Sequence, residues 1–356
     1  MNENEKTPRS FRCLLVTGGA GFIGSAFIRF LFRQAGFEGR VVNYDALTYA
    51  GNLENVAGAV DESRYEFVRG DICDRDLVLR TCEKAGVDGI VNFAAESHVD
   101  RSILGPAAFV QTNVMGTFSL LEVVRARPNI HFHHVSTDEV FGSLGPTGAF
   151  TEESPYQPNS PYSASKAASD HLVRAYAHTY GISTTLSNCS NNYGPYQFPE
   201  KLIPLMILNM LEGKPLPVYG DGMNVRDWLF VDDHAEAIWN VLRLGRAGST
   251  YNVGGRSEWP NLKLLEKLIE IVGAETGRSV SSLRELITFV KDRPGHDRRY
   301  AVDATKIERE LGFVPRHDID SGLRETVRWY LANPGWIERV RSGAYREWLE
   351  KNYAAR

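Results

Sequence analysis

The chain has 356 residues, 43% of them hydrophobic, which is more than one hydrophobic core usually organises, so we expect two lobes. Its formal net charge of -4 leaves no global basic field and excludes nucleic acid or an anionic membrane as the main partner. The four cysteines include no Cys-x-x-Cys pair, which argues against a zinc site or a disulfide framework and favours reduced thiols. A small ligand and no metal are expected.

The polarity of the first residues and the length of the apolar stretches bear on where the protein is located. The opening Met1–Ser10 is polar, and no later stretch approaches the roughly 20 apolar residues that span a bilayer. We therefore predict a cytoplasmic protein without membrane association, whose residues 1–11 form a flexible tail.

Short apolar runs alternate with longer amphipathic segments in the first half of the chain. Runs that are apolar throughout suit parallel strands buried on both faces, and strand–helix alternation builds a doubly wound sheet. The expected strands are Cys13–Thr17, Arg40–Tyr44, Tyr65–Val68, Gly89–Ala95, Ile130–Thr137 and Ile182–Ser187, with expected helices at Gly21–Gln34, Asp74–Ala85 and Pro106–Arg125. The pattern predicts an α/β fold with a Rossmann-type parallel sheet.

The pattern changes after about Asn192, where Gly and Pro punctuate Tyr193–Pro199 and Pro215–Gly222. We predict a smaller α/β lobe over residues 193–356. Strand and helix patterns near residues 225–254 suggest that this part returns to the first domain.

A glycine-rich turn follows the first expected strand, with Gly18, Gly21 and Gly24 at three-residue spacing around Phe22 and Ile23. Glycine lets the backbone turn sharply and approach a pyrophosphate, whose charge meets the N–H groups at a helix N-terminus. A glycine trio alone is also compatible with an ordinary tight turn.

Asp45 strengthens the prediction of a dinucleotide-binding site, because it stands 21 residues beyond Gly24 at the end of the second expected strand. A carboxylate there accepts hydrogen bonds from a ribose diol and repels a 2′-phosphate, which favours NAD over NADP. Asp71 and Ile72 follow the third strand and Phe93–Ser97 the fourth, at the same edge of the sheet. We assign residues 12–192 to an NAD-binding domain.

Tyr162 and Lys166 are four residues apart on a helix that Ser160 caps and Pro161 opens. A nearby positive charge would lower the pKa of a tyrosine from about 10 toward working pH and let Tyr162 remove a hydroxyl proton. Tyr-x-x-x-Lys also occurs by chance on a solvated helix face.

Two acids follow the fifth expected strand: Thr137 ends it, and Asp138 and Glu139 come next. Charges at the end of a buried strand are costly unless they are used or paired, and neighbouring carboxyls in different environments can act as proton donor and acceptor. The alternative is a helix-capping Asp beside a solvated Glu.

Together these segments resemble the bacterial dTDP-glucose 4,6-dehydratases of the extended short-chain dehydrogenase/reductase family. The resemblance covers about Arg12–Tyr353 and is carried by Thr17–Ser25, Ala94–Ser102, Ser136–Val140, Ser160–Lys166, Asn188–Pro204, Arg226–Leu229 and Asp292–Asp297. Simple epimerases of the same class share the glycines and the Tyr/Lys pair but typically lack acids like Asp138 and Glu139.

The resemblance implies a reaction cycle on dTDP-glucose in deoxysugar biosynthesis, with NAD unchanged at the end. Tyr162, supported by Thr137 and Lys166, would deprotonate the 4-hydroxyl; Glu139 would remove the C5 proton; and Asp138 would protonate the departing 6-hydroxyl. The product would be dTDP-4-keto-6-deoxyglucose.

The resemblance also implies the binding residues. Those expected around NAD are Gly18, Gly21, Phe22, Ile23, Gly24, Asp45, Ala46, Leu47, Thr48, Asp71, Ile72, Phe93, Ala94, Ala95, Ser97, Thr112, Tyr162, Lys166 and Asn192. Those expected around the sugar nucleotide are Ser97, Thr137, Asn191, Lys201, Leu202, Pro217, Val218, Tyr219, Arg226, Asn261, Asp292, Arg293, Pro294, Gly295 and His296.

Two departures from the family pattern, the competing functions and the oligomeric state complete the expectations from the sequence. Phe141 stands where the family commonly has Tyr, and the glycine-rich connection Gly142–Glu153 is shorter than in many relatives. Competing hypotheses are an epimerase, a dehydratase acting on another base, or a catalytically silent NAD-binding protein. From the resemblance we expect a homodimer through the helices at Pro106–Arg125 and Pro161–Tyr180, although the apolar residues Phe109, Val110, Leu120 and Leu121 suit an internal core equally well.

Overall fold

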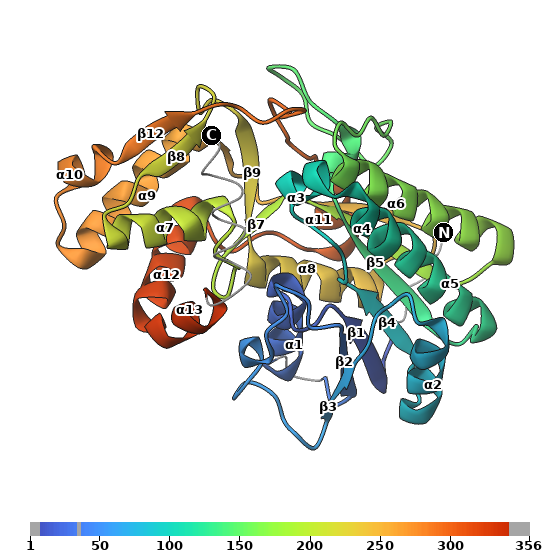
Figure 1. Cartoon of the computed structure of the whole chain (residues 1–356). Helices are drawn as coiled ribbons and strands as arrows, with labels where there is room; N and C mark the ends of the chain where they lie inside the picture. Colours follow the sequence, from blue (N-terminus) through green and yellow to red (C-terminus); the bar gives the residue numbers. More distant parts are fainter. Residues whose placement is uncertain (1–7, 34–36, 342–356) are drawn as a thin grey trace.

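The computed structural model describes residues 8–33 and 37–341. A seven-stranded sheet, parallel throughout, organises the first lobe in the order β10-β6-β5-β4-β1-β2-β3 (Figure 1). Its strands are β1 Cys13–Thr17, β2 Arg40–Asp45, β3 Tyr65–Arg69, β4 Gly89–Asn92, β5 His131–Thr137, β6 Thr184–Cys189 and β10 Thr250–Val253. The prediction of a Rossmann-type parallel sheet is confirmed.

Helices cover both faces of this sheet. Alternate residues of one strand separate the two cores: Leu14 packs with α1 (Phe22–Arg33) and α8 (Val231–Leu244), and Leu15 packs with α2 (Arg75–Ala85), α5 (Thr117–Ala126) and α6 (Pro161–Tyr180). Because the strand order reverses between β1 and β4, a crevice forms there at the carboxyl ends of the strands.

The second lobe carries two small sheets. β11 (Glu258–Pro260), β9 (Val225–Phe230) and β7 (Asn191–Tyr193) form one, and β12 (Ile287–Val290) and β8 (Leu216–Tyr219) form the other. Their apolar side chains pack with α7 (Leu202–Glu212), α9 (Asn261–Thr276), α12 (Ile319–Ala332) and α13 (Pro334–Val340). The remaining helices are α3 Val99–Leu104, α4 Pro106–Phe109, α10 Val280–Arg284 and α11 Thr305–Leu311.

The segment near residues 225–254 belongs to both lobes. β9 lies in the three-stranded sheet, whereas α8 and β10 lie in the first lobe, α8 against α1 and β10 at the edge of the large sheet. At the other end of the chain, Arg9 donates from its backbone N–H to the Arg243 carbonyl (2.8 Å), so part of the expected tail is held by α8. Residues 1–7 of that tail lie outside the described residues.

The single helix expected at Pro106–Arg125 is three consecutive segments: α4, a π-helical stretch at Val110–Gly116, and α5. Phe109, Leu120 and Leu121 are buried within the chain, which settles them as core, whereas Val110 is exposed. By length and composition Pro106–Ala126 is apolar enough to cross a membrane, so the expectation that no stretch approaches that length is wrong. Half of an 18-residue stretch within it is buried inside the protein, as in the core helix of a globular domain.

Candidate active site

A cavity of about 550 Å³ opens at the carboxyl ends of β1 and β4. All five residues predicted to carry the chemistry line it, together with every residue predicted around NAD except Leu47. Leu47 does not line the cavity; its backbone takes a positive φ of 52°, and its N–H donates to the Asp45 carboxylate. Leu47 is therefore a residue that shapes the loop.

The glycine turn has the geometry that a pyrophosphate requires. Gly18 adopts φ +68°, where only glycine is unstrained, and a Cβ at Gly18 would come within 2.6 Å of the Ala94 nitrogen. A Cβ at Gly24 would overlap the Gly18 carbonyl, so both positions exclude a side chain. The turn leads directly into α1, whose first residues line the cavity, and the N–H groups of a helix N-terminus favour an anion. This cradle fits a dinucleotide.

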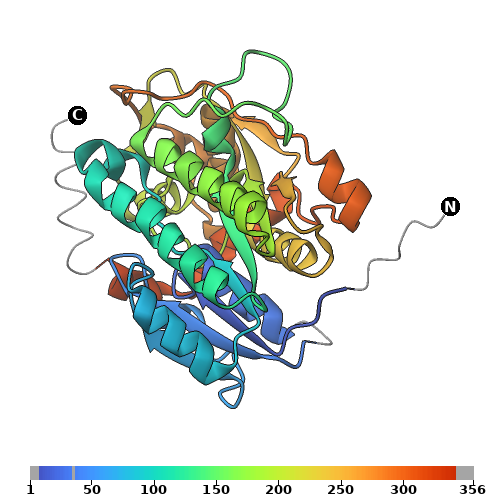
Figure 2. The same cartoon turned by 90° about the vertical axis from the view of Figure 1, so that its right-hand side faces the viewer.

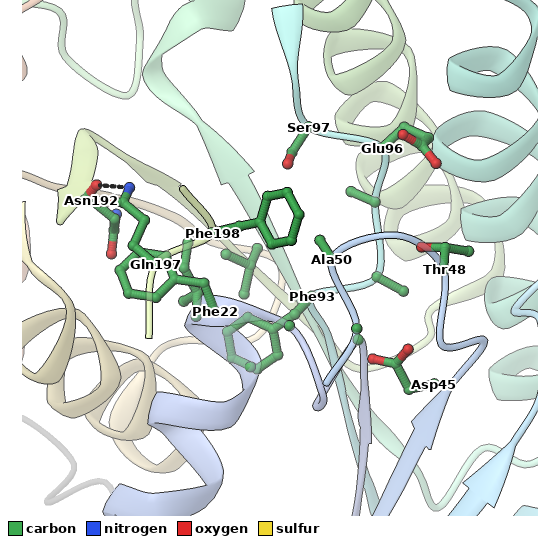
Figure 3. A pocket seen from close by; sticks show the side chains of 18 of the residues that line it. Phe22, Asp45, Thr48, Ala50, Phe93, Glu96, Ser97, Asn192, Gln197 and Phe198 are labelled. Atoms are coloured by element: carbon green, nitrogen blue, oxygen red, sulfur yellow. Dashed lines mark hydrogen bonds between the residues drawn. The ribbon is translucent and has the colours of Figure 1, made fainter. Parts of the chain in front are cut away.

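Asp45 lies at the end of β2 on one side of the cavity, beside Thr48 (Figure 3). Its carboxylate accepts hydrogen bonds from the backbone N–H groups of Ala20 (2.9 Å) and Leu47 (2.8 Å). Burial raises the pKa of Asp45, and the two backbone donors oppose that shift. Two oxygens with spare lone pairs remain able to accept from a ribose diol.

Tyr162 and Lys166 lie on the first turns of α6, where Ser160 forms a capping box and Pro161 is the first helical residue, as predicted. The Lys166 Nζ donates to the Val135 carbonyl (2.9 Å) and lies 3.4 Å from His134 Nε2. Both side chains are buried against the end of β5.

The expected lowering of the Tyr162 pKa is not what this arrangement produces. Burial raises the pKa of Tyr162 well above its ordinary value, and Glu139 and Cys189 add to the rise, while the Thr137 hydroxyl opposes it. Burial also lowers the pKa of Lys166. Desolvation is therefore the largest influence on the pKa of both side chains in this structure.

Asp138 and Glu139 begin a short 3₁₀ turn, Asp138–Phe141, directly after β5. Thr137, and not Asp138, is the capping residue: its hydroxyl accepts from the Glu139 N–H and donates to Asp138 Oδ1, both at 3.3 Å. The helix-capping alternative for Asp138 is therefore wrong. Phe141 is buried between Phe150 and Tyr156, away from the cavity.

The two acids differ in their surroundings. Burial raises the pKa of Asp138 well above its ordinary value, and Glu139 and Asp227 raise it further. Burial also raises the pKa of Glu139, but Arg293 and Arg226 counter it with positive charge. Burial and neighbouring carboxylates thus oppose ionisation of Asp138, whereas neighbouring cations favour ionisation of Glu139.

The residues predicted for the sugar nucleotide divide into two groups. Ser97, Thr137, Asn191 and Lys201 line the cavity. The others do not line it: Leu202, Pro217, Val218, Tyr219, Arg226, Asn261, Asp292, Arg293, Pro294, Gly295 and His296.

Part of the second group is nevertheless next to the acids. Arg226 and Arg293 act electrostatically on Glu139, and Arg293 lies 3.8 Å from Asp100, which accepts a hydrogen bond from the Tyr219 hydroxyl at 3.3 Å. Arg293 Nε and Asn261 Oδ1 are buried without a hydrogen-bond partner among the described residues. Unpaired buried polar atoms beside cations fit an anionic, polar ligand.

Sequence reasoning missed one wall of the cavity. Tyr196, Gln197 and Phe198 after β7, together with Trp336 and Arg339 of α13, also line it. Figure 3 shows Gln197 and Asn192 joined by a hydrogen bond across the cavity from Asp45 and Thr48. No local pattern pointed to these aromatic and basic residues. Within residues 8–33 and 37–341, no group of three or more His, Cys, Asp or Glu side chains could hold a metal ion.

Comparison with known proteins places this site in a family. A family model described as GDP-mannose 4,6 dehydratase matches residues 15–326. A dTDP-glucose 4,6-dehydratase from Salmonella typhimurium is 53% identical, over 96% of this chain and 99% of that protein. The crystal structure of DesIV, a dTDP-glucose 4,6-dehydratase from Streptomyces venezuelae with NAD bound, superposes with a TM-score of 0.86 at 51% identity, covering 92% of this chain and 99% of that one.

A UDP-glucose 4-epimerase from Thermotoga maritima shares the fold with a TM-score of 0.81 over 90% of this chain and 99% of its own, but at only 27% identity. The Salmonella typhimurium and Streptomyces venezuelae proteins, each above 50% identity, are both dehydratases. With its cradle for a dinucleotide and its paired acids, the chain belongs to the dTDP-glucose 4,6-dehydratases of the extended short-chain dehydrogenase/reductase family.

Proposed function

We propose that this protein dehydrates dTDP-glucose to dTDP-4-keto-6-deoxyglucose with bound NAD, as a step in deoxysugar biosynthesis. The observation that carries the proposal is the pair Asp138 and Glu139, held in different electrostatic surroundings within one cavity with Tyr162 and Lys166. Bound NAD would supply a hydride acceptor at C4 and a hydride donor at C6.

The geometry supports a distinct role for each side chain. Tyr162 removes the proton of the 4-hydroxyl, and its hydrogen bond with the Thr137 hydroxyl counters the rise in its pKa. Asp138, whose pKa is raised by burial, donates a proton to the departing 6-hydroxyl. Glu139, the acid faced by cations, takes the C5 proton.

Binding of the two ligands divides between the lobes. We propose that residues 12–192 hold NAD, with Asp45 on the adenosine ribose and Lys166 on the nicotinamide ribose. Residues 193–356 hold the sugar nucleotide, with Lys201, Arg226 and Arg293 near the diphosphate and Tyr219 against the base. The unpaired Arg293 Nε supports this assignment.

A panel of nucleotide-glucose donors tests the function. The purified protein is incubated with dTDP-, UDP-, GDP- and CDP-glucose, and each mixture is assayed for a 4-keto-6-deoxy sugar. We expect this product from dTDP-glucose with the highest kcat/KM. A C4 epimer in place of the 4-keto-6-deoxy sugar would contradict the proposal and favour the epimerase hypothesis.

We also propose a homodimer formed through α5 and α6, which lie side by side on one face of the molecule (Figure 2). Apolar side chains exposed along α3 to α5 and at the end of α6 are Leu104, Val110, Met115, Phe118 and Tyr180. A second copy of the same face would cover them through an isologous contact. This also accounts for the apolar character of Pro106–Ala126 without a bilayer. A monomeric mass by light scattering at micromolar concentration would refute the dimer.

Location and membrane association follow the same proposal. We propose that the protein is located in the cytoplasm, where its four free cysteines stay reduced, and that it does not bind membranes. Cell fractionation checks this: the protein should remain in the supernatant after membranes are sedimented.

A further inference from the structure

The cavity wall that sequence reasoning missed joins two segments that lie far apart in the chain. The loop after β2, residues 46–56, lies against the glycine turn, and α13, near the other end of the chain, packs on that loop. We propose that α13 slows the release of bound NAD by holding the loop in place, and we call α13 the clasp. Asn55 connects the clasp to the glycine turn and is called the joint, and Trp336 and Arg339 are positioning residues. This inference rests on the NAD site of the proposed function.

The joint is a buried amide that links three elements. The Trp336 indole N–H donates to Asn55 Oδ1 (2.9 Å), and Asn55 Nδ2 donates in turn to the Ala20 carbonyl of the glycine turn (3.0 Å). Arg29 of α1 donates to the Asn55 carbonyl (2.8 Å). Both ends of the side-chain amide are used, so α13 and the glycine turn are held at a set separation.

The joint continues to the residue expected to hold the adenosine ribose. The backbone N–H of Ala20, whose carbonyl Asn55 binds, donates to Asp45 Oδ2. Displacement of Asn55 would therefore move Ala20. This would shift the glycine turn at the pyrophosphate and also the N–H group that binds Asp45.

An ion pair and an aromatic contact reinforce the joint. Arg339 binds both carboxylate oxygens of Glu54 at 2.6 Å, a bidentate arrangement that fixes orientation as well as distance. Phe198 packs with Tyr49 and Val340, so residues from both lobes close the cavity beside the loop.

The reaction gives a reason for such a clasp. In the proposed cycle, hydride leaves C4 and returns to C6 of the same substrate, so loss of the reduced cofactor between the two transfers would abort the turnover. Most oxidoreductases exchange their nicotinamide cofactor each cycle and need no such restraint. A slow release rate is therefore a functional requirement of this site.

The experiment compares release rates of NADH from four variants. Trp336→Phe keeps an aromatic ring but leaves Asn55 Oδ1 buried without its donor, and Arg339→Ala removes the exposed ion pair. Trp329→Phe, in the same aromatic cluster (ring centroids 5.0 Å apart), and Arg284→Ala, which breaks a similarly exposed pair with Glu266, are the matched controls. Protein loaded with NADH is mixed with excess NAD, and the loss of bound-nicotinamide fluorescence is followed.

We expect the release rate to rise on the order of tenfold in Trp336→Phe, since one buried hydrogen bond is lost, and about threefold in Arg339→Ala. The two controls should release NADH at the parent rate, and in urea all folded variants should unfold at similar midpoints. Parental release rates in both clasp variants, or equal acceleration in the controls, would overturn the proposal. If Trp336→Phe does not fold, Arg339→Ala decides alone.

Release is measured without sugar nucleotide, which separates the clasp from the reaction. A parent protein that retains NADH but does not dehydrate dTDP-glucose would contradict the proposed function and leave the clasp standing.

Discussion

Replacing either acid by its amide should stop the cycle after the first oxidation. Asp138→Asn keeps the oxygen that accepts from Thr137 at 3.3 Å, and both amides are close to the parent side chains in size, so the fold should be retained. What each variant loses is proton transfer. The 4-keto sugar and NADH should form, and elimination of water should stall.

The size of the effect follows from the chemistry and the burial of the site. A positioned general acid or base contributes about 10²–10⁴ in rate, which corresponds to about 2.7–5.4 kcal/mol of activation free energy. Asp138 is 1% exposed and its Oδ2 has no hydrogen-bond partner among the described residues, so bulk water is poorly placed to replace it as a donor. We therefore expect a loss at the upper end of this range for Asp138→Asn.

The assay distinguishes the two roles. Each variant is mixed with dTDP-glucose while absorbance of reduced nicotinamide is followed, and exchange of the C5 hydrogen is measured in deuterated water. Glu139→Gln should suppress exchange, because the base at C5 is lost, whereas Asp138→Asn should retain some of it. Full turnover by both variants without NADH accumulation would make the acid pair structural and refute the reasoning.

Three further predictions concern the cofactor, the first oxidation and pH. Asp45→Ala should weaken NAD binding by more than tenfold while dTDP binding measured by calorimetry stays the same, because a charged acceptor for the ribose is lost; equal NAD affinity would remove Asp45 from the site. Tyr162→Phe should leave both ligands bound and lower the rate of NADH formation by about 10²-fold or more in stopped-flow experiments, since only the ionisable hydroxyl is lost. Burial lowers the pKa of His131 to about 3, of His134 to about 4 and of His234 to about 3. Because these pKa values lie below that of an unfolded histidine, the folded protein binds fewer protons than the unfolded chain. The free energy of unfolding should therefore be largest above about pH 6.5 and fall as the pH drops toward about 4. The decrease should reach up to about 1.4 kcal/mol per histidine and pH unit. Urea unfolding at pH 7.5 and pH 5 checks this, and equal free energies of unfolding would contradict it.

Local patterns in the sequence were sufficient for the elements that depend on near neighbours. Cys13–Thr17 is a strand with the predicted bounds, and Ser160 and Pro161 begin α6 as predicted, because hydrophobic periodicity, capping and proline geometry act within a few residues. The placement of Asp138 and Glu139 directly after a buried strand could also be read without a structure. These features carried the family resemblance.

The tertiary structure decided what depends on distant residues or on burial. The contact between Asn55 and Trp336 joins positions 281 apart in the chain, and nothing in either local sequence predicts it. Leu47 does not line the cavity, and its N–H donates to the Asp45 carboxylate, a bond that depends on the folded loop. The pKa of Tyr162 rises because its helix is packed against the end of β5, an environment that the spacing to Lys166 does not reveal. Sequence thus determined which groups are present and on which elements, whereas desolvation and long-range contacts, which exist only once the chain has folded, determined how strongly each group is perturbed and which wall closes the site.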